Sequence, residues 1–179
     1  MPRIPYLDED VADPADLVAA IRARRGGKLW ILDRMLLRSP PLARAWNTFL
    51  GMVRTELGVD GKLRELAICA VAALTGAEYE FRHHSPLFLR AGGTDAQLAR
   101  LAALGRGEVD DGGAGAFDEA ERAILQLALE MTRDVSIRDS TFAAVLKLLG
   151  ERGTVELVAI ISAYNMVARF LVALGIEPE

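Results

Sequence analysis

The chain contains the sequence Arg64-Glu65-Leu66-Ala67-Ile68-Cys69, followed after a Thr75-Gly76 break by Ala77-Glu78-Tyr79-Glu80-Phe81-Arg82-His83-His84. Its apolar residues have the pattern of two buried helices, but Glu65, Glu80 and His84 interrupt them. An ionisable side chain on an apolar face is costly unless it is paired or has a function. The same stretch contains the two histidines and the one cysteine of the chain. These residues therefore form a candidate site.

Helix-forming patterns also occupy most of the chain on both sides of this stretch. Thr94 and Gln97 form a capping box, the signature of a helix N-terminus. Proline follows Asp13 and Ser39, where it suits the first turn of a helix. Residues 105–116 are rich in glycine and aspartate, as in a loop. Sustained alternation of apolar residues with a period of two is absent, so the sequence predicts an all-α fold, with helices over residues 13–25, 28–38, 39–56, 60–75, 77–91, 94–104, 117–133, 136–149 and 155–174.

Length and composition limit the class of protein. A chain of 179 residues, with 51% hydrophobic and 26% charged residues, is expected to form one globular domain. Its net charge of −4 argues against nucleic acid as a main partner, because phosphate binding needs a concentrated basic surface. A single cysteine allows neither an intrachain disulfide nor a cysteine-based metal cluster.

The sequence pattern also predicts neither a secretory signal peptide nor a membrane-spanning helix. Residues 1–5 lack the apolar core of a signal peptide. The longest nearly apolar run, Leu66 to Ala77, is too short to cross a bilayer. We therefore expect a cytoplasmic protein that has no membrane partner.

Helical geometry selects one of the two histidines. At about 100° per residue, a helix over 77–91 places Glu80 and His84 on its inward face. The same counting places Tyr79, Arg82 and His83 on the other side. Glu80 and His84 are four residues apart, so their side chains can meet. A carboxylate beside an imidazole fixes the tautomer and tunes the pKa for proton transfer near neutral pH. Alternatively, the pair is a structural hydrogen bond and His83 is a surface residue.

Glu65 and Cys69 share a face of the preceding helix. If the two helices pack as a hairpin across Thr75-Gly76, Glu65 can approach Glu80 and His84. The simpler interpretations are that Glu65 caps the helix or bridges to an arginine, and that Cys69 is an inert core residue. Two glutamates and one histidine could also bind a metal. Since no second inward histidine is available and the carboxylates lie in apolar helices, we expect no metal.

The spacing of these residues resembles the carboxymuconolactone decarboxylase family, which includes the alkyl hydroperoxidase D branch. That branch has the motif Glu, eleven residues, Cys, two residues, Cys, three residues, His. Laid on this chain from Glu65, the cysteine positions fall on Ala77 and Glu80 and the histidine falls on His84. The following Leu89-Arg90-Ala91-Gly92, with Thr94, also resembles the family's continuation.

The resemblance implies one alkyl hydroperoxidase D-like helical bundle over residues 1–179. It divides the chain into an N-terminal helical extension to about residue 58, a family core over about 59–104, the loop 105–116 and C-terminal helices over 117–175. A glutamate near the start of a second apolar helix, in Val155-Glu156-Leu157-Val158, repeats the pattern around Glu65. The chain is therefore either two related helical halves or a bundle in which two core helices each begin with a glutamate favoured by the helix dipole.

The loss of both motif cysteines decides which chemistry of the family to expect. The peroxidase branch needs a thiolate and a resolving thiol, which Ala77 and Glu80 cannot supply. The decarboxylase branch implies proton-transfer chemistry on a small organic acid or lactone without a cofactor. In that chemistry His84 is the general acid or base, Glu80 its orienting partner or the base itself, and Glu65 a second carboxylate.

Further residues are candidates for binding a small-molecule substrate. Tyr164 lies in an apolar helix where its hydroxyl needs a partner, although it also suits the core. Arg82, Cys69 and His83 complete the predicted substrate-binding set, and Arg64 and Arg169 are further cations for a substrate carboxylate. Two other functions remain open. One is an antioxidant that depends on Cys69 alone. The other is a non-catalytic scaffold, and here the resemblance implies a homo-oligomer with the site near a subunit boundary.

Overall fold

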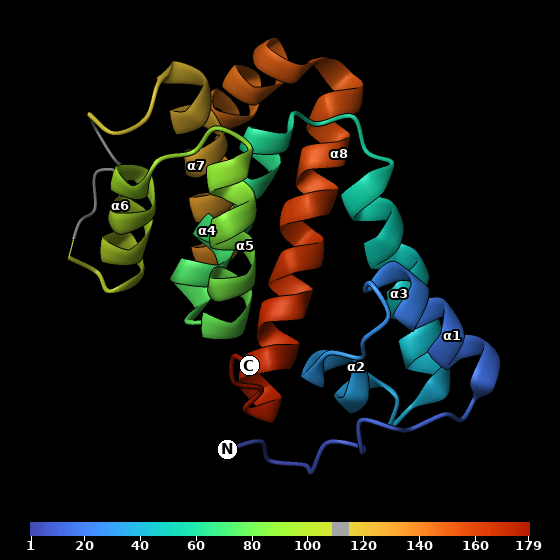
Figure 1. The fold of residues 1–179 in the computed structure, drawn as a ribbon. Coiled ribbons are helices and arrows are strands. Elements are labelled where there is room, and N and C mark those ends of the chain that lie inside the picture. Colours follow the sequence, from blue (N-terminus) through green and yellow to red (C-terminus); the bar gives the residue numbers. More distant parts are fainter. Residues whose placement is uncertain (109–114) are drawn as a thin grey trace. The chain divides into compact units, whose positions relative to one another are not determined.

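The computed structural model describes residues 1–108 and 115–179, and every regular element in them is an α-helix (Figure 1). Residues 109–114, within the expected loop 105–116, lie outside the described residues. The all-α prediction is confirmed, with helices α1 (Ala15–Arg24), α2 (Ile31–Leu36), α3 (Pro40–Thr55), α4 (Gly61–Thr75), α5 (Glu78–Arg90), α6 (Asp95–Gly105), α7 (Glu119–Arg133) and α8 (Asp139–Leu174).

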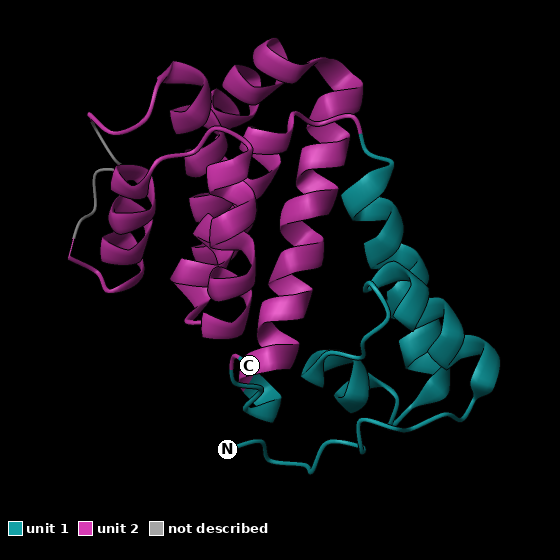
Figure 2. Cartoon of the chain, in the orientation of Figure 1, with its two compact units in different colours: residues 1–57, 173–177, 179 teal, residues 58–172, 178 magenta. Residues whose placement is uncertain are grey.

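The chain divides into two compact units (Figure 2). Unit 1 consists of residues 1–57, 173–177 and 179, and unit 2 of residues 58–172 and 178. The division after Leu57 lies close to the expected end of the N-terminal extension.

In unit 1, α1 and α2 both contact α3. The buried residues of α3 recur every three or four positions, as in an amphipathic helix; they are Ala43, Trp46, Leu50 and Val53. The helix expected over residues 28–38 is shorter in the structure, because a buried aspartate sets its start. Asp33 accepts a hydrogen bond from the Trp30 amide at 3.1 Å and forms an ion pair with Arg25 at 3.1 Å.

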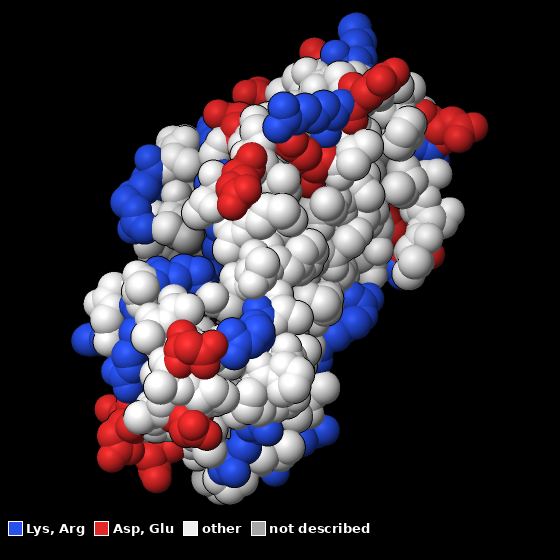
Figure 3. All heavy atoms as spheres, turned by 90° about the vertical axis from the view of Figure 1, so that its right-hand side faces the viewer, with Lys and Arg blue, Asp and Glu red and all other residues white. Residues whose placement is uncertain are grey.

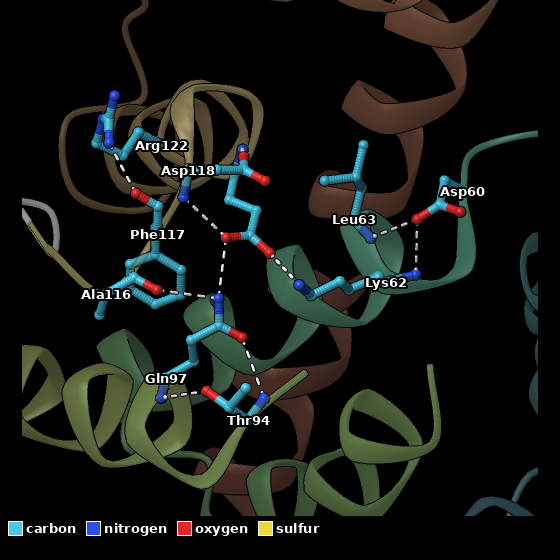
Figure 4. Close-up of polar contacts among 10 residues, drawn as sticks. Asp60, Lys62, Leu63, Thr94, Gln97, Ala116, Phe117, Asp118 and Arg122 are labelled. Atoms are coloured by element: carbon cyan, nitrogen blue, oxygen red, sulfur yellow. Dashed lines mark hydrogen bonds and ion pairs between the residues drawn. The ribbon is translucent and has the colours of Figure 1, made fainter. Parts of the chain in front are cut away.

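In unit 2, α4 contacts α5, α6 and α7 and forms the centre of the packing. All residues from Glu65 to Ala72 are buried, which is typical of a helix that is enclosed on every side. The Asp60 side chain accepts hydrogen bonds from the Lys62 and Leu63 amides and caps the N-terminus (Figure 4). Gly76, with φ of 67°, ends α4 in the left-handed conformation that glycine tolerates, and α5 starts two residues later.

A buried polar network connects α4, α6 and α7 (Figure 4). Glu121 accepts hydrogen bonds from Gln97 Nε2 at 2.9 Å and the Asp118 amide at 3.0 Å, and pairs with Lys62. Gln97 also completes the capping box with Thr94, as its sequence pattern predicts. The network satisfies a buried carboxylate and connects the N-terminal ends of the three helices.

Helix α8 contains a break at Gly150, where φ is 67° and ψ is 179°. The two helices expected over 136–149 and 155–174 lie on either side of it, and the second begins earlier than expected. By length and composition α8 could cross a membrane, but half of its most apolar window is buried in the protein, as in a core helix. On the face shown in Figure 3, acidic and basic side chains are interspersed.

Candidate active site

The centre of the candidate site is a hydrogen bond between two helices. Nδ1 of His84, on α5, lies 2.7 Å from Oε2 of Glu65, on α4. The tight turn at Gly76 reverses the chain, so residues on either side of it meet although they are 19 positions apart. The structure thus brings Glu65 to His84 across the helical hairpin, as the sequence suggests.

Both partners are almost enclosed, with 5% of Glu65 and 6% of His84 exposed. Burial alone would raise the pKa of the Glu65 carboxyl, but the hydrogen bond and charge of His84, together with Arg64, bring this pKa below its usual value. Arg64 Nε lies 3.3 Å from Oε1 of Glu65. Glu65 is therefore an anion at neutral pH, and its bond to His84 is charge-assisted.

The ionised Glu65 assigns the tautomer of His84. A carboxylate can only accept hydrogen bonds, so Nδ1 of His84 must carry the proton that it donates to Oε2. Any exchange of protons by the ring then takes place at Nε2. A carboxylate that holds one imidazole nitrogen in this way orients the ring and stabilises its protonated form.

Tyr164 brings a third helix, α8, to the site. Its ring lies edge-on to the His84 ring, with centroids 4.9 Å apart and planes at 87°, and it is fully buried. This edge-to-face contact limits how the imidazole can tilt. Tyr164 therefore lies at the histidine that helical counting selects.

Glu80 is buried on α5, one turn before His84. Nδ1 of His84 donates its orienting hydrogen bond to Glu65, and the pairing of Glu80 with His84 stays a prediction. Spacing along one helix favours Glu80 as the partner of His84. The contact with Glu65 depends instead on the angle between α4 and α5, which the periodicity of one helix does not determine.

Cys69 has the features of an unreactive thiol. It is fully buried, and burial, followed by the negative charges of Glu65 and Glu80, raises the pKa of its thiol far above the usual value. A hydrogen bond with Ser85, which sequence reasoning did not single out, acts in the opposite direction but is the weakest influence. Because the thiolate is the reactive form, this environment suppresses thiol chemistry.

The other predicted substrate-binding residues lie outside this buried cluster. Arg82 is exposed, and His83 is half-buried with its ring 4.2 Å from that of Tyr79. Tyr79 itself is buried, although helical counting predicts it on the outer side; the N-terminal end of α5 is enclosed more widely than one face. Arg169 is exposed on α8 and bonds Asn165, so Arg64 is the candidate cation with a direct contact to the site.

Within residues 1–108 and 115–179, no group of three His, Cys, Asp or Glu side chains is arranged to hold a metal ion. The acid–base groups of the site are thus a histidine, the carboxylate that orients it and a second buried carboxylate.

Comparison with known proteins shows which family the chain resembles. Residues 40–130 match the sequence model of the carboxymuconolactone decarboxylase family, a wider range than the expected core. A comparison with curated proteins finds no match.

Solved structures with the same fold cover nearly the whole chain. An uncharacterized peroxidase-related protein from Silicibacter sp. TM1040 is 16% identical with a TM-score of 0.74, and covers 99% of this chain and 92% of its own. An alkylhydroperoxidase AhpD core protein from Ralstonia eutropha JMP134 is 17% identical with a TM-score of 0.77, over 99% and 92%. The debrominase Bmp8, in a cysteine-to-alanine variant in complex with 2,3,4-tribromopyrrole, is 20% identical with a TM-score of 0.74, over 97% and 90%. At these identities the likeness establishes the alkyl hydroperoxidase D-like fold.

Proposed function

This chain belongs to the carboxymuconolactone decarboxylase family, and we propose that it is a cofactor-free enzyme that transfers protons on a small organic acid or lactone. Membership of the family supports a role as a small-molecule enzyme or an antioxidant. The observation that favours acid–base chemistry is the buried hydrogen bond of 2.7 Å between Glu65 and Nδ1 of His84.

His84 is the general acid–base in this proposal. When Nε2 takes a proton from the substrate, the ring becomes positively charged, and the ionised Glu65 beside Nδ1 stabilises that charge. In a decarboxylation, the electron pair of the broken C–C bond stays on the substrate carbon as carbon dioxide leaves, and His84 returns a proton to that carbon. Glu80 is the second carboxylate that can accept or supply a proton close by.

One cation and the fold support the proposed substrate class. Arg64, which already contacts Glu65, is the candidate partner of a substrate carboxylate. The same fold holds a small ring compound in the structure of Bmp8 with 2,3,4-tribromopyrrole. Dithiol peroxidase chemistry is not proposed, because Ala77 and Glu80 occupy the motif's cysteine positions and Cys69 is a buried thiol of raised pKa.

Proton exchange from heavy water tests the proposal. The protein is incubated with small keto acids and carboxy-substituted lactones, and deuterium incorporation and release of carbon dioxide are measured. For a substrate found in this way, His84→Ala should lower turnover by about 10²- to 10⁴-fold, the usual contribution of a general acid–base. His83→Ala is the matched control and should retain turnover. If His84→Ala turned over substrate at the unaltered rate, His84 would not be the acid–base group.

We also propose that the protein acts in the cytoplasm as a homo-oligomer. The proposal rests on what the resemblance to the family implies. Analytical ultracentrifugation of the purified protein, which measures its oligomeric state, tests the homo-oligomer. A monomer at all concentrations would contradict the oligomer without affecting the chemistry proposed for His84.

A further inference from the structure

A cavity lies in unit 2, between the C-terminal end of α7 and α8. It has a volume of about 350 Å³ and is lined by Met131, Val135, Ile137, Ser162, Asn165, Met166 and Arg169. The four residues from α8 recur at three- and four-residue spacing and form one face of that helix. Tyr164, which contacts His84, points about 140° away from Arg169 on the helix wheel, so this cavity is separate from the candidate active site.

A buried amide holds a guanidinium at this cavity. Arg169 Nη1 donates to Oδ1 of Asn165 at 2.6 Å and to its carbonyl oxygen at 3.0 Å. Asn165 is only 8% exposed, and its Nδ2 donates to Thr132 Oγ1 at 3.0 Å and to the Ile161 carbonyl at 3.1 Å. Both ends of the amide are engaged, which fixes Oδ1 as the acceptor and pre-organises the arginine for a ligand.

The charge at the cavity is uncompensated. Arg169 forms no ion pair with any residue of the described chain, and the residues that line the cavity include no carboxylate. A guanidinium has five N–H donors in a planar fork, which fits a carboxylate with two parallel hydrogen bonds. The cavity therefore favours a single anionic group beside Arg169.

Apart from Ser162, the rest of the wall is apolar. Met131, Met166 and Ile137 present adaptable hydrophobic surface, which suits a flexible hydrocarbon. Val135 is 82% exposed and has φ of 53°, a conformation that is strained for a β-branched residue. This places an exposed apolar side chain at the rim, where a ligand would cover it.

We propose that this cavity binds a small carboxylic acid with an apolar body. The carboxylate pairs with Arg169, and the hydrocarbon contacts the two methionines. The volume is at the lower end of the range of known ligand pockets, so the acid is short, of the size of a medium-chain alkanoate.

Hexanoate is the probe, and methionine methyl resonances report its binding. In protein labelled with carbon-13 at the methionine methyl groups, hexanoate should shift the signals of Met131 and Met166 with saturation. The signals of Met35 and Met52, in unit 1, should stay in place and serve as internal controls. Hexanol, which lacks the carboxylate, should bind at least about tenfold more weakly.

Two variants test whether hexanoate binding depends on the charge of Arg169. Arg169→Gln should weaken hexanoate binding by about tenfold or more, whereas Arg90→Gln, an exposed arginine on α5, should leave it unchanged. Met166→Glu, at an exposed position, places a carboxylate beside Arg169 and should also abolish binding. Absence of any saturable shift at Met131 and Met166, or equal binding by hexanol or by the Arg169→Gln protein, would overturn the proposal.

Discussion

Two buried glutamates of unit 2, Glu65 and Glu130, are held in different ways. Glu130 accepts hydrogen bonds from the Arg138 amide at 2.9 Å, the Arg138 guanidinium at 2.6 Å, Thr141 at 2.8 Å and Gln126 at 2.9 Å. Within the described residues, Glu65 has two partners, His84 and Arg64. Glu130 thus joins α7 to the start of α8, while Glu65 depends mainly on one histidine.

The hydrogen-bond partners distinguish a buried glutamate with a structural role from one with a functional role. Burial opposes ionisation of Glu130, but its amide, hydroxyl and guanidinium donors bring the pKa down to about 2. None of these donors changes protonation in the physiological range. One partner of Glu65, His84, is a histidine, the type of side chain that serves as an acid–base group near neutral pH. A carboxylate with several hydrogen-bond donors that do not titrate is suited to stabilising the fold. A carboxylate paired with a histidine is suited to proton transfer.

The largest effect that would sharpen this contrast is on activity. Glu65→Gln removes the charge that stabilises protonated His84 and should lower turnover by roughly 10²-fold or more, while stability changes by only about 1 kcal/mol. Turnover of a substrate found by deuterium exchange and urea unfolding measure the two quantities. Glu78→Gln, an exposed glutamate on the same hairpin, is the control. Normal turnover in the Glu65→Gln protein would make Glu65 a structural residue like Glu130.

Glu130 should show the reverse behaviour. Glu130→Ala leaves the buried Thr141 hydroxyl and the Arg138 and Gln126 donors without their acceptor and should lower the free energy of unfolding by about 3 kcal/mol. Urea denaturation measures the loss, with Glu151→Ala, exposed on α8, as the control. Turnover at a temperature where the variant is folded should match that of the unaltered protein. A loss below that of the control would show that the hydrogen bonds of Glu130 contribute nothing net.

Acid should remove the contribution of Glu130 in a defined range. Its pKa is about 2 in the folded protein and close to the ordinary 4.5 when unfolded, so its stabilisation is complete above pH 4.5 and disappears as the pH falls towards 2. With allowance for the exposed Arg138, the loss is about 2 kcal/mol. Urea midpoints at steps between pH 5 and pH 2 should fall more steeply in the unaltered protein than in Glu130→Gln. If the urea midpoints of the two proteins fell in parallel, groups other than Glu130 would be responsible for the acid sensitivity.

The sequence predicts elements whose ends are set by local chemistry. The Asp60 cap, the Thr94–Gln97 capping box and Gly76 all involve residues close in sequence, and the structure contains each of them. The start of α2 depends on Asp33, which is buried by contacts with Arg25 and Arg24. Such contacts arise between separate elements, and the hydrophobic pattern of a single helix does not record them.

The candidate site shows the same division. Helical counting places His84 inward and Arg82 outward, and both positions agree with the structure. The hydrogen bond between Glu65 and Nδ1 of His84 depends on the angle and register of α4 against α5. The periodicity of a single helix does not determine either of these. The edge-on contact of Tyr164 arises in the same way, because α8 is distant in sequence.

The smallest effect is expected at Cys69, which lies close enough to both glutamates for their charges to disfavour its thiolate. Cys69→Ala should leave turnover within about twofold, since a buried thiol of raised pKa has no part in proton transfer at His84. In the native protein a thiol-specific alkylating reagent should modify Cys69 only upon unfolding, which mass spectrometry detects. Burial, together with the charges of the two glutamates, is then the reason that this thiol stays unreactive. Rapid alkylation of the folded protein, or peroxide-driven oxidation of Cys69, would instead show that the hairpin opens enough for thiol chemistry and would favour the antioxidant function over proton transfer.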